Sequence, residues 1–414
     1  MKVERSAMGF ESWRLAVRNL FRHRARSVSA LVAIVFGVVA LLIASGYIEW
    51  VFWAMREAAI ESQLGHVQVV RPGYFHKGLA DPFRYRLSEN DPELQLVRSA
   101  PYVELVTPRL NFSGLISHGE NTVSFLGVGV AVETERRVSK QVAMIAGSEL
   151  TGGDSDQVIL GEGLAAGLDA KVGDIVVLMA NTASGGLNAM ERRVQGVFRS
   201  STKAYDDMAL RLPITAARRL LRTEGAHVWV VLLDDTAHTD MAVAALRRRL
   251  NDRDYELVPW YEQADFYNKT VTLFSHQVSV VWVLIAMVIV LSISNTMIMS
   301  VLERTREIGT LLALGFRRTK ILRQFIVEGL VLGMVGGIMG LVVGVLLARV
   351  ISLVGIPMPP PPGMAVGFVG EVIVTWTLAG GALLFALITS VVASAYPAWM
   401  ASRLKIVDAL RHNR

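Results

Sequence analysis

Residues 325–350 read FIVEGLVLGMVGGIMGLVVGVLLARV. The stretch is long and apolar enough to cross a bilayer as a helix, which takes about 20 apolar residues. Its charged residues, Glu328 and Arg349, lie near its two ends. Glycines recur along it at a spacing of four, which is typical of helices that approach each other closely in lipid. They are Gly333, Gly336, Gly337, Gly340 and Gly344. We expect these glycines to pack against helices of the same chain, or to line a contact that slides or opens.

Three further apolar runs flank this one. The chain is 52% hydrophobic and 19% charged, which is typical of a membrane protein. Four spans are expected, at residues 28–54, 273–302, 321–351 and 372–396. The first is too long for the roughly 7–15-residue apolar core of a signal peptide, so we expect it to stay as an anchor.

Lysine and arginine predict the orientation of these spans. They are frequent before span one, between spans two and three and after span four, whereas residues 352–371 contain neither. The positive-inside rule therefore places both termini in the cytoplasm, as in a multi-pass protein of the bacterial inner membrane. Residues 49–275 carry 24 Lys and Arg against 29 Asp and Glu, and the rest of the chain carries 18 against 7. The basic excess thus reflects topology and does not indicate nucleic-acid binding.

The segment 55–272 is large enough for a folded α+β domain of two subdomains. Alternation and β-branched residues predict strands at 66–70, 122–130, 174–179, 192–198 and 227–233. Amphipathic helices are expected at 215–222 and 240–252, the second capped by Thr239. A hairpin that includes Asn181, Gly185, Gly186, Leu187 and Met190 is expected near 180–190.

Shorter segments complete the plan of the chain. Residues 1–27 predict an amphipathic helix at the cytoplasmic surface, and residues 397–414 a cytoplasmic tail. Residues 352–371 include a proline run, which predicts a stiff external loop or, less favoured, a docking site for a partner.

The sequence lacks the motifs of an enzyme. It has no G-x-x-x-x-G-K-[ST], H-E-x-x-H or G-x-S-x-G, no Cys, and eight His without ligand spacing. We therefore expect no catalytic, cofactor-binding or metal residues. The predicted spans also lack charged residues at their centres, so we do not expect them to form a channel for solutes. The membrane part is expected to anchor and move the external domain.

The stretch ERTREIGTLLALGFRRTK, residues 303–320, joins spans two and three. As a helix it places Ile308, Leu311 and Leu312 on one face, and Gly315 at the position where helices often end. Such a helix either docks onto a cytoplasmic ATPase or lies among lipid headgroups. Its periodicity alone does not choose between these readings.

Two motifs carry a family resemblance. ERTREIGTLLALGFRR followed by a Gly-rich span, and SAYPAWMASRLKIVDALR at 394–411, resemble FtsX-like ABC permeases, which include MacB-type and lipoprotein-releasing LolC/LolE-type members. Asp408 stands where many members have Pro. The resemblance covers residues 278–411 and implies a MacB/FtsX-type fold: four transmembrane α-helices with a large α+β extracytoplasmic domain inserted between helices 1 and 2.

The resemblance also implies partners. A cytoplasmic ABC ATPase dimer would bind ATP and Mg and drive motion of the external domain, because this chain carries no ATPase motif. A second permease copy, identical or homologous, and a periplasmic chaperone or adaptor are expected. The coupling helix would comprise Glu303, Arg304, Arg306, Glu307, Ile308, Leu311, Leu312, Leu314, Gly315 and Phe316.

The resemblance leaves the cargo open. Release of a lipoprotein or another lipid-like cargo from the membrane is the leading expectation. The resemblance implies a partner-binding role for the hairpin residues Asn181, Gly185, Gly186, Leu187 and Met190. The hairpin lacks the Pro-containing pattern of the family's chaperone-binding loops, which weakens a chaperone role. The alternatives are a signalling subunit that controls a partner such as a cell-wall hydrolase, and a MacB-like efflux permease. A membrane enzyme is disfavoured.

Overall fold

The computed structural model describes residues 24–78, 81–89, 91–140, 142–152, 155–200, 202–359 and 367–404. Residues 1–23 of the helix predicted at 1–27, most of the proline run and the tail beyond 404 lie outside these ranges. Residues 24–27 are described and belong to the helix α2 (Arg24–Ala59). The chain divides into a membrane unit, Met1–Phe52 with Thr270–Ile356 and Val369–Arg414, and a β-rich unit, Trp53–Lys269 with Pro357–Phe368. Each unit is described by itself below.

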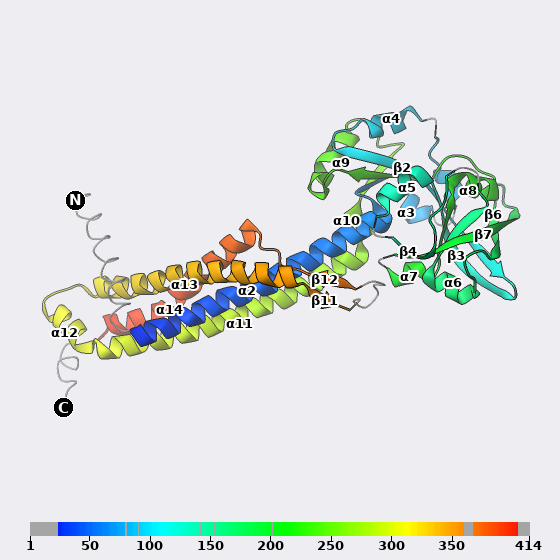
Figure 1. Cartoon of the computed structure of the whole chain (residues 1–414). Helices are drawn as coiled ribbons and strands as arrows, with labels where there is room; N and C mark the ends of the chain where they lie inside the picture. The colour runs from blue at the N-terminus through cyan, green and yellow to red at the C-terminus, as the bar shows by residue number, and fades with distance from the viewer. Residues whose placement is uncertain are drawn as a thin grey trace. The chain divides into compact units, whose positions relative to one another are not determined.

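Four long helices are apolar enough to cross a membrane. They are α2 (Arg24–Ala59), α11 (Asp265–Glu303), α13 (Arg318–Val354) and α14 (Trp376–Ser402). The short helix α12 (Thr305–Ala313) joins α11 to α13, as Figure 1 shows. All four long helices extend beyond the residues that the sequence assigned to the bilayer, except at the N-terminal end of α14. Helix α2 continues directly into a single π-helical turn, η1 (Ile60–Leu64).

Helix α13 packs through its glycines on two sides. A Cβ atom added to Gly336 or Gly340 would lie 2.8 Å from Ile34 Cγ2 or 2.7 Å from Val38 Cβ of α2. On another face, Gly333 and Gly337 lie against Ser390, Ala386 and Leu383 of α14. Gly344 packs against Leu42 of α2 in the same way as Gly336 and Gly340. Small residues permit this close approach, and it occurs within one chain.

The β-rich unit is built around one 10-stranded sheet. Its strands are β1 (Val67–Val70), β2 (Val103–His118), β3 (Asn121–Val130), β4 (Ala143–Gly147), β5 (Gln157–Gly161), β6 (Ile175–Asn181), β7 (Leu187–Arg199), β8 (Ala209–Pro213), β9 (Val228–Leu233) and β10 (Glu256–Pro259). Strands β2, β3, β8, β5, β7 and β6 pair in a closed ring, because β6 bonds to both β7 and β2. Beyond the ring, β2 pairs with β9, and β1 lies between β9 and β10.

The long strand β2 belongs to both parts of this sheet. Its first half pairs with β9 and its second half with β6, while β3 runs beside it from Arg109 to His118. The helices of this unit are α3 (Tyr74–Lys77), α4 (Pro92–Arg98), α5 (Val132–Val138), α6 (Glu162–Leu168), α7 (Lys203–Asp206), α8 (Ile214–Leu221), α9 (Thr239–Arg247) and α10 (Trp260–Gln263), with 3-10 turns η2 (Pro82–Tyr85) and η3 (Thr236–His238). Its core includes the fully buried rings of Trp229, Phe125 and Phe198.

The five predicted strands and both predicted helices of this unit are present. Most of their ends agree within two residues, but β7 begins at Leu187 instead of residue 192, and α9 ends at Arg247 instead of residue 252. The cap is wrong: His238 precedes α9, and the Thr239 hydroxyl donates to the Thr236 carbonyl at 2.6 Å instead of accepting from the helix. The preceding turn η3 extends the helical path upstream, so Thr239 is already inside it. Residues 352–371 form two short paired strands, β11 (Ile356–Met358) and β12 (Phe368–Gly370), around the undescribed part of the proline run.

Candidate functional sites: the coupling helix and a buried arginine cluster

The backbone geometry defines both the start and the end of helix α12. It begins after Arg304, whose backbone leaves helical geometry at φ −96° and ψ 12° and so separates α11 from α12. At the other end the Gly315 N–H donates to the Leu312 carbonyl at 3.0 Å, and the Phe316 N–H donates to the Leu311 carbonyl at 3.1 Å. Gly315 has φ +87°, a conformation that glycine adopts without strain. This is a Schellman motif, and it fixes the length of α12.

A buried ion pair holds the start of α12 against α13. Arg304 Nη1 donates to Glu328 Oε1 at 2.9 Å, and the two side chains are only 10% and 9% exposed. Thr305 at the first position of α12 is also buried, and its hydroxyl donates to the Leu302 carbonyl. The junction of three helices is therefore locked by a charged contact as well as by apolar packing.

The apolar face of α12 is turned partly inward. Ile308 is 4% exposed and shares an apolar cluster with Val301 of α11 and with Ile321 and Phe325 of α13, and Leu312 packs on that cluster. The expected ATPase contacts of Arg304 and Ile308 are therefore corrected, because both side chains are buried inside this chain.

The exposed surface of the coupling segment, residues 303–320, consists of other residues. Glu303, Arg306 and Glu307 are exposed, Leu314 is 72% exposed and Phe316 is 38% exposed, with Lys320 Nζ 4.4 Å above the Phe316 ring. Leu311 is half-buried. Their contact with an ATPase stays a prediction.

The hairpin near 180–190 joins β6 to β7. Thr182 and Gly186 close its turn through a backbone hydrogen bond of 2.7 Å, and Gly185 has φ +83°. Asn181 ends β6, and Leu187 begins β7 with its side chain 72% exposed. Met190 instead packs against the core, so it does not belong to the tip. The role of the hairpin in partner binding is not tested by this geometry.

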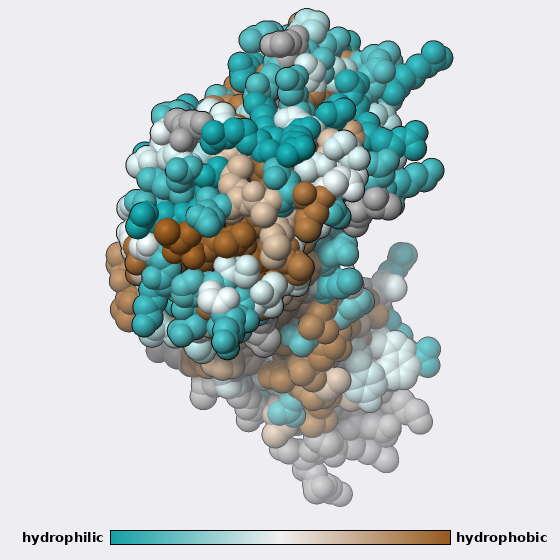
Figure 2. Space-filling view, turned by 90° about the vertical axis from the view of Figure 1, so that its right-hand side faces the viewer, coloured by the Kyte–Doolittle hydropathy of each residue, from teal (hydrophilic) through white to brown (hydrophobic). Residues whose placement is uncertain are grey.

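The surface near these strands carries apolar side chains. Figure 2 shows an apolar band across a mostly hydrophilic face of the molecule. Exposed apolar residues of the adjacent strands β2, β6 and β7 include Leu115, Ile175 and Leu187.

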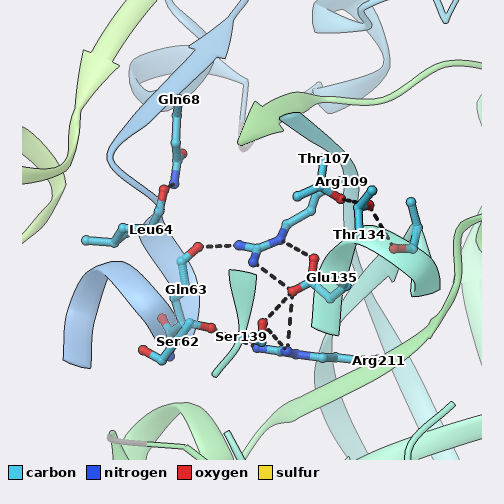
Figure 3. Close-up of polar contacts among 11 residues, drawn as sticks. Ser62, Gln63, Leu64, Gln68, Thr107, Arg109, Thr134, Glu135, Ser139 and Arg211 are labelled. Atoms are coloured by element: carbon cyan, nitrogen blue, oxygen red, sulfur yellow. Dashed lines mark hydrogen bonds and ion pairs between the residues drawn. The ribbon is translucent and has the colours of Figure 1, made fainter. Parts of the chain in front are cut away.

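A buried cluster of two arginines and one glutamate lies beneath the turn η1 (Figure 3). Arg109 on β2 makes a two-pronged contact with Glu135 of α5, with Nε–Oε2 3.1 Å and Nη2–Oε1 2.7 Å. Arg211 on β8 lies 3.4 Å from the same carboxylate and donates to the Ser139 hydroxyl at 2.9 Å. Ser139 in turn donates to Glu135 at 2.7 Å.

The two arginines also bind the end of the helical path that begins with α2. Arg109 donates to the Gln63 carbonyl, and Arg211 Nη2 donates to the Ser62 carbonyl at 3.0 Å. The last carbonyls of a helix lack intrahelical partners and carry partial negative charge, so guanidinium groups stabilise them. We call these five residues, Ser62, Gln63, Arg109, Glu135 and Arg211, the stalk clasp.

The clasp sets the protonation of its carboxylate. Burial by itself raises the pKa of Glu135, but the charges of Arg109 and Arg211 outweigh burial and hold this pKa below its ordinary value. Glu135 is thus ionised at neutral pH. The ionised form is what both guanidinium groups require, because a buried cation without a counter-charge is strongly unfavourable.

The sequence predicted the residues of the coupling helix but neither the Arg304–Glu328 pair nor the stalk clasp. Glu328 was noted only as a charge near the end of a span, and Arg109, Glu135 and Arg211 were not singled out. Arg109 and Arg211 do interrupt apolar strand patterns, and a charged residue at a core position is a usable signal of a buried ion pair. The partners are 26 and 76 residues from Glu135, so spacing could not reveal them. In the described ranges, no group of three or more His, Cys, Asp or Glu is placed to hold a metal ion.

Two family models match the chain. The model described as MacB-like periplasmic core domain matches residues 27–249, and the model described as FtsX-like permease C-terminal matches residues 279–406. Together they cover most of α2 and of the β-rich unit, the part of α11 from residue 279 onward, and α12 to α14.

Curated relatives agree with these matches. MacB, a macrolide export ATP-binding/permease protein, from Sodalis glossinidius is 26% identical over 97% of this chain and 60% of its own length. An uncharacterized ABC transporter permease of Methanocaldococcus jannaschii is 26% identical over 64% of each chain. MacB of Campylobacter jejuni is 24% identical over 78% of this chain and 51% of its own. The chain thus spans about half to two thirds of the length of these relatives.

Solved structures of external domains also match. The extracellular domain of the transporter YknZ from Gram-positive bacteria is 16% identical, with a TM-score of 0.36, over 47% of this chain and all of that one. The periplasmic region of MacB from Actinobacillus actinomycetemcomitans is 16% identical, with a TM-score of 0.36, over 50% of this chain and 93% of that one.

Proposed function

Because this chain belongs to the ABC transporter permeases that combine a MacB-like periplasmic core domain with an FtsX-like C-terminal membrane domain, we propose that it converts ATP hydrolysis by a partner into motion of its β-rich unit. The partner is an ABC ATPase dimer that holds ATP and Mg at the cytoplasmic side and docks on α12. Two permease chains, identical or homologous, face one ATPase dimer. The chain lies in the bacterial inner membrane with both termini in the cytoplasm.

The single observation that carries this proposal is the construction of α12. Its start is locked to α13 by the buried Arg304–Glu328 pair, and its end is fixed by the Schellman motif at Gly315. A push on such a rigid helix is passed to α11 and α13 instead of being absorbed by a loop. Leu314 and Phe316 offer apolar contact on the exposed side.

The stalk clasp supports the second half of the proposal. Helix α2 continues without interruption into η1, and Arg109 and Arg211 bind the last carbonyls of that turn. The clasp joins them to β2, β8 and α5 in one buried network. Tilting of α2 would therefore move these elements together.

The proposed cargo is a lipoprotein or another lipid-anchored molecule taken from the outer face of the membrane. A large folded unit and spans without central charges favour handling of the cargo outside the bilayer core. The apolar side chains near the β6–β7 hairpin provide surface for an amphipathic cargo or for a periplasmic carrier or adaptor. MacB relatives are named for macrolide export, so a MacB-like efflux permease is the second candidate. A signalling subunit that moves an external hydrolase is the third.

Docking is tested by Leu314→Glu combined with Phe316→Glu. Both side chains are exposed, so the variant should insert and fold but no longer co-purify with the ATPase in mild detergent. Arg323→Gln, an exposed change on the cytoplasmic end of α13, is the matched control and should retain the ATPase. Retention of the ATPase by the double variant would refute the docking surface.

Cargo is tested with the permease and its ATPase reconstituted in proteoliposomes. ATP-dependent release of a lipoprotein to a soluble carrier supports the lipoprotein proposal. Export of a macrolide instead supports the efflux reading, and release of neither, with an external hydrolase activated by ATP turnover, supports signalling.

A further inference from the structure

A cavity of about 810 Å³ lies between the C-terminal end of α13 and the N-terminal end of α14, entirely within the membrane unit. This volume is within the range of roughly 300–1,000 Å³ that small-molecule sites occupy. Its walls include Leu341, Val345, Arg349, Glu371 and Trp376.

The lining is divided into an apolar and a polar part. From Leu341 to Leu353 the cavity follows α13 for about 18 Å, at 1.5 Å per residue. That length is close to one leaflet, since the whole hydrocarbon core is about 30 Å thick. Leu341 and Val345 line the part of the cavity nearer the middle of α13, and Arg349, Glu371 and Trp376 line the part near its C-terminal end. The cavity therefore has the length and polarity of a membrane lipid.

Two opposite charges stand in the polar part. Arg349 and Glu371 are both exposed, and within the described ranges neither makes an ion pair or a side-chain hydrogen bond. Hydrogen bonds hold the backbone that follows Glu371 in place. The Val372 N–H donates to the Ser352 hydroxyl at 3.0 Å, and the Ile373 N–H donates to the Gly46 carbonyl at 3.0 Å. The position of Glu371 along the chain is therefore fixed. Both charged groups are free to meet a ligand that carries both signs.

An aromatic side chain completes the polar part. Trp376 begins α14 and is 95% exposed, although it is large and mostly apolar. Exposed tryptophans at the ends of spans lie at the headgroup level of a bilayer. Its position marks the depth at which a lipid headgroup would lie.

We propose that this cavity binds one phosphatidylethanolamine molecule, with the phosphate on Arg349, the ammonium on Glu371 and an acyl chain along Leu341 and Val345. Guanidinium groups bind phosphate through directed hydrogen bonds. A primary ammonium donates hydrogen bonds to a carboxylate, whereas the trimethylammonium of phosphatidylcholine donates none and phosphatidylglycerol has no cation. The cavity therefore selects the zwitterion with an N–H donor. This site is separate from the docking and cargo surfaces of the proposed function.

The test uses the full chain in detergent with phosphatidylethanolamine, phosphatidylcholine or phosphatidylglycerol of the same acyl chains, and native mass spectrometry to measure retained lipid. We expect one phosphatidylethanolamine per chain, retained about fivefold better than the other two lipids, as for a partly exposed ion pair. Equal retention of all three lipids, or a preference for phosphatidylcholine through the Trp376 ring, would overturn the proposal.

Variants separate the two headgroup contacts. Glu371→Leu should bind phosphatidylethanolamine and phosphatidylcholine equally, because no side-chain oxygen remains to accept from the ammonium. Arg349→Gln should lose retention of both, and Arg349→Lys should restore it in part. Arg323→Gln at the other end of α13 is the matched control and should bind as the unchanged chain does. If Glu371→Leu still prefers phosphatidylethanolamine, the ammonium contact is refuted, and the size-exclusion profile of each variant confirms that it is folded.

Discussion

Arg304 Nη1 lies 2.9 Å from Glu328 Oε1, and these two buried side chains tie the coupling helix to the third membrane helix. The pair joins the chain at the point where α11, α12 and α13 meet. The pair keeps this helix of nine residues from rotating on its flanking turns, which the proposed transmission of force requires.

Removing one partner of this pair should be costly. Glu328→Leu leaves Arg304 buried without a counter-charge and should lower the free energy of unfolding by about 3–5 kcal/mol. Arg304→Met combined with Glu328→Met should recover much of that loss, because no buried charge remains. Thermal unfolding in detergent measures the effect, and exposed Arg306→Ala serves as the control. A single variant as stable as the unchanged chain would show that the pair is solvated.

The close contacts at the glycines of α13 predict that an added methyl group there lowers stability. A Cβ at position 340 would lie 2.7 Å from Val38 Cβ and 3.2 Å from the Val35 carbonyl oxygen, so Gly340→Ala must push α2 away. The overpacking should cost about 1–3 kcal/mol. Gly380→Ala in α14 meets nothing within 4 Å and should be neutral or slightly stabilising, since alanine favours helix. Equal melting temperatures of the two variants would contradict the packing.

Neutralising the Glu135 carboxylate should disrupt the stalk clasp. Glu135→Gln leaves Arg109 and Arg211 together without a counter-charge and should destabilise the β-rich unit by about 3–5 kcal/mol. Glu149→Gln breaks the exposed Arg136–Glu149 pair, which should cost less than about 1 kcal/mol. Hydrogen exchange of the peptide covering residues 60–64 is the specific readout, because loss of the clasp frees these carbonyls and loosens the turn. Unchanged exchange there would argue against the clasp.

His227 should make stability depend on pH. It is fully buried against the Tyr74 ring at 5.7 Å, and burial lowers its pKa to about 4. The unfolded chain takes up a proton near pH 6.5 and the folded chain does not, so stability falls as the pH falls from about 6.5 to about 4. The full contribution is about 3 kcal/mol.

His227→Phe removes this dependence, and its melting temperature should exceed that of the unchanged chain by more at pH 5 than at pH 7.5. Burial also lowers the pKa of His66, which acts in the same direction in both proteins and cancels in the comparison. Exposed His76→Gln is the control. A constant difference between the two pH values would mean that His227 has the same pKa in the folded and the unfolded chain.

The sequence by itself determined the membrane class, the four spans, the inserted α+β unit and the coupling segment with its end at Gly315. These features depend on local signals: apolar runs long enough for a bilayer, helical and strand periodicity, and a glycine at a helix end. The same signals predicted that the glycines of span three lie at helix contacts. They did not predict that Gly336, Gly340 and Gly344 contact α2 whereas Gly333 and Gly337 contact α14.

Only the tertiary structure decided which side chains face inward. The sequence predicts that Arg304 is an exposed basic residue of a cytoplasmic turn. In the structure it is buried and paired with Glu328, which lies 24 residues further along the chain. The clasp brings together residues from η1, β2, α5 and β8, and the ring closes because β6 bonds to both β2 and β7. Pairing between distant segments depends on how the whole sheet and bundle pack, and periodicity within one segment carries no information about it.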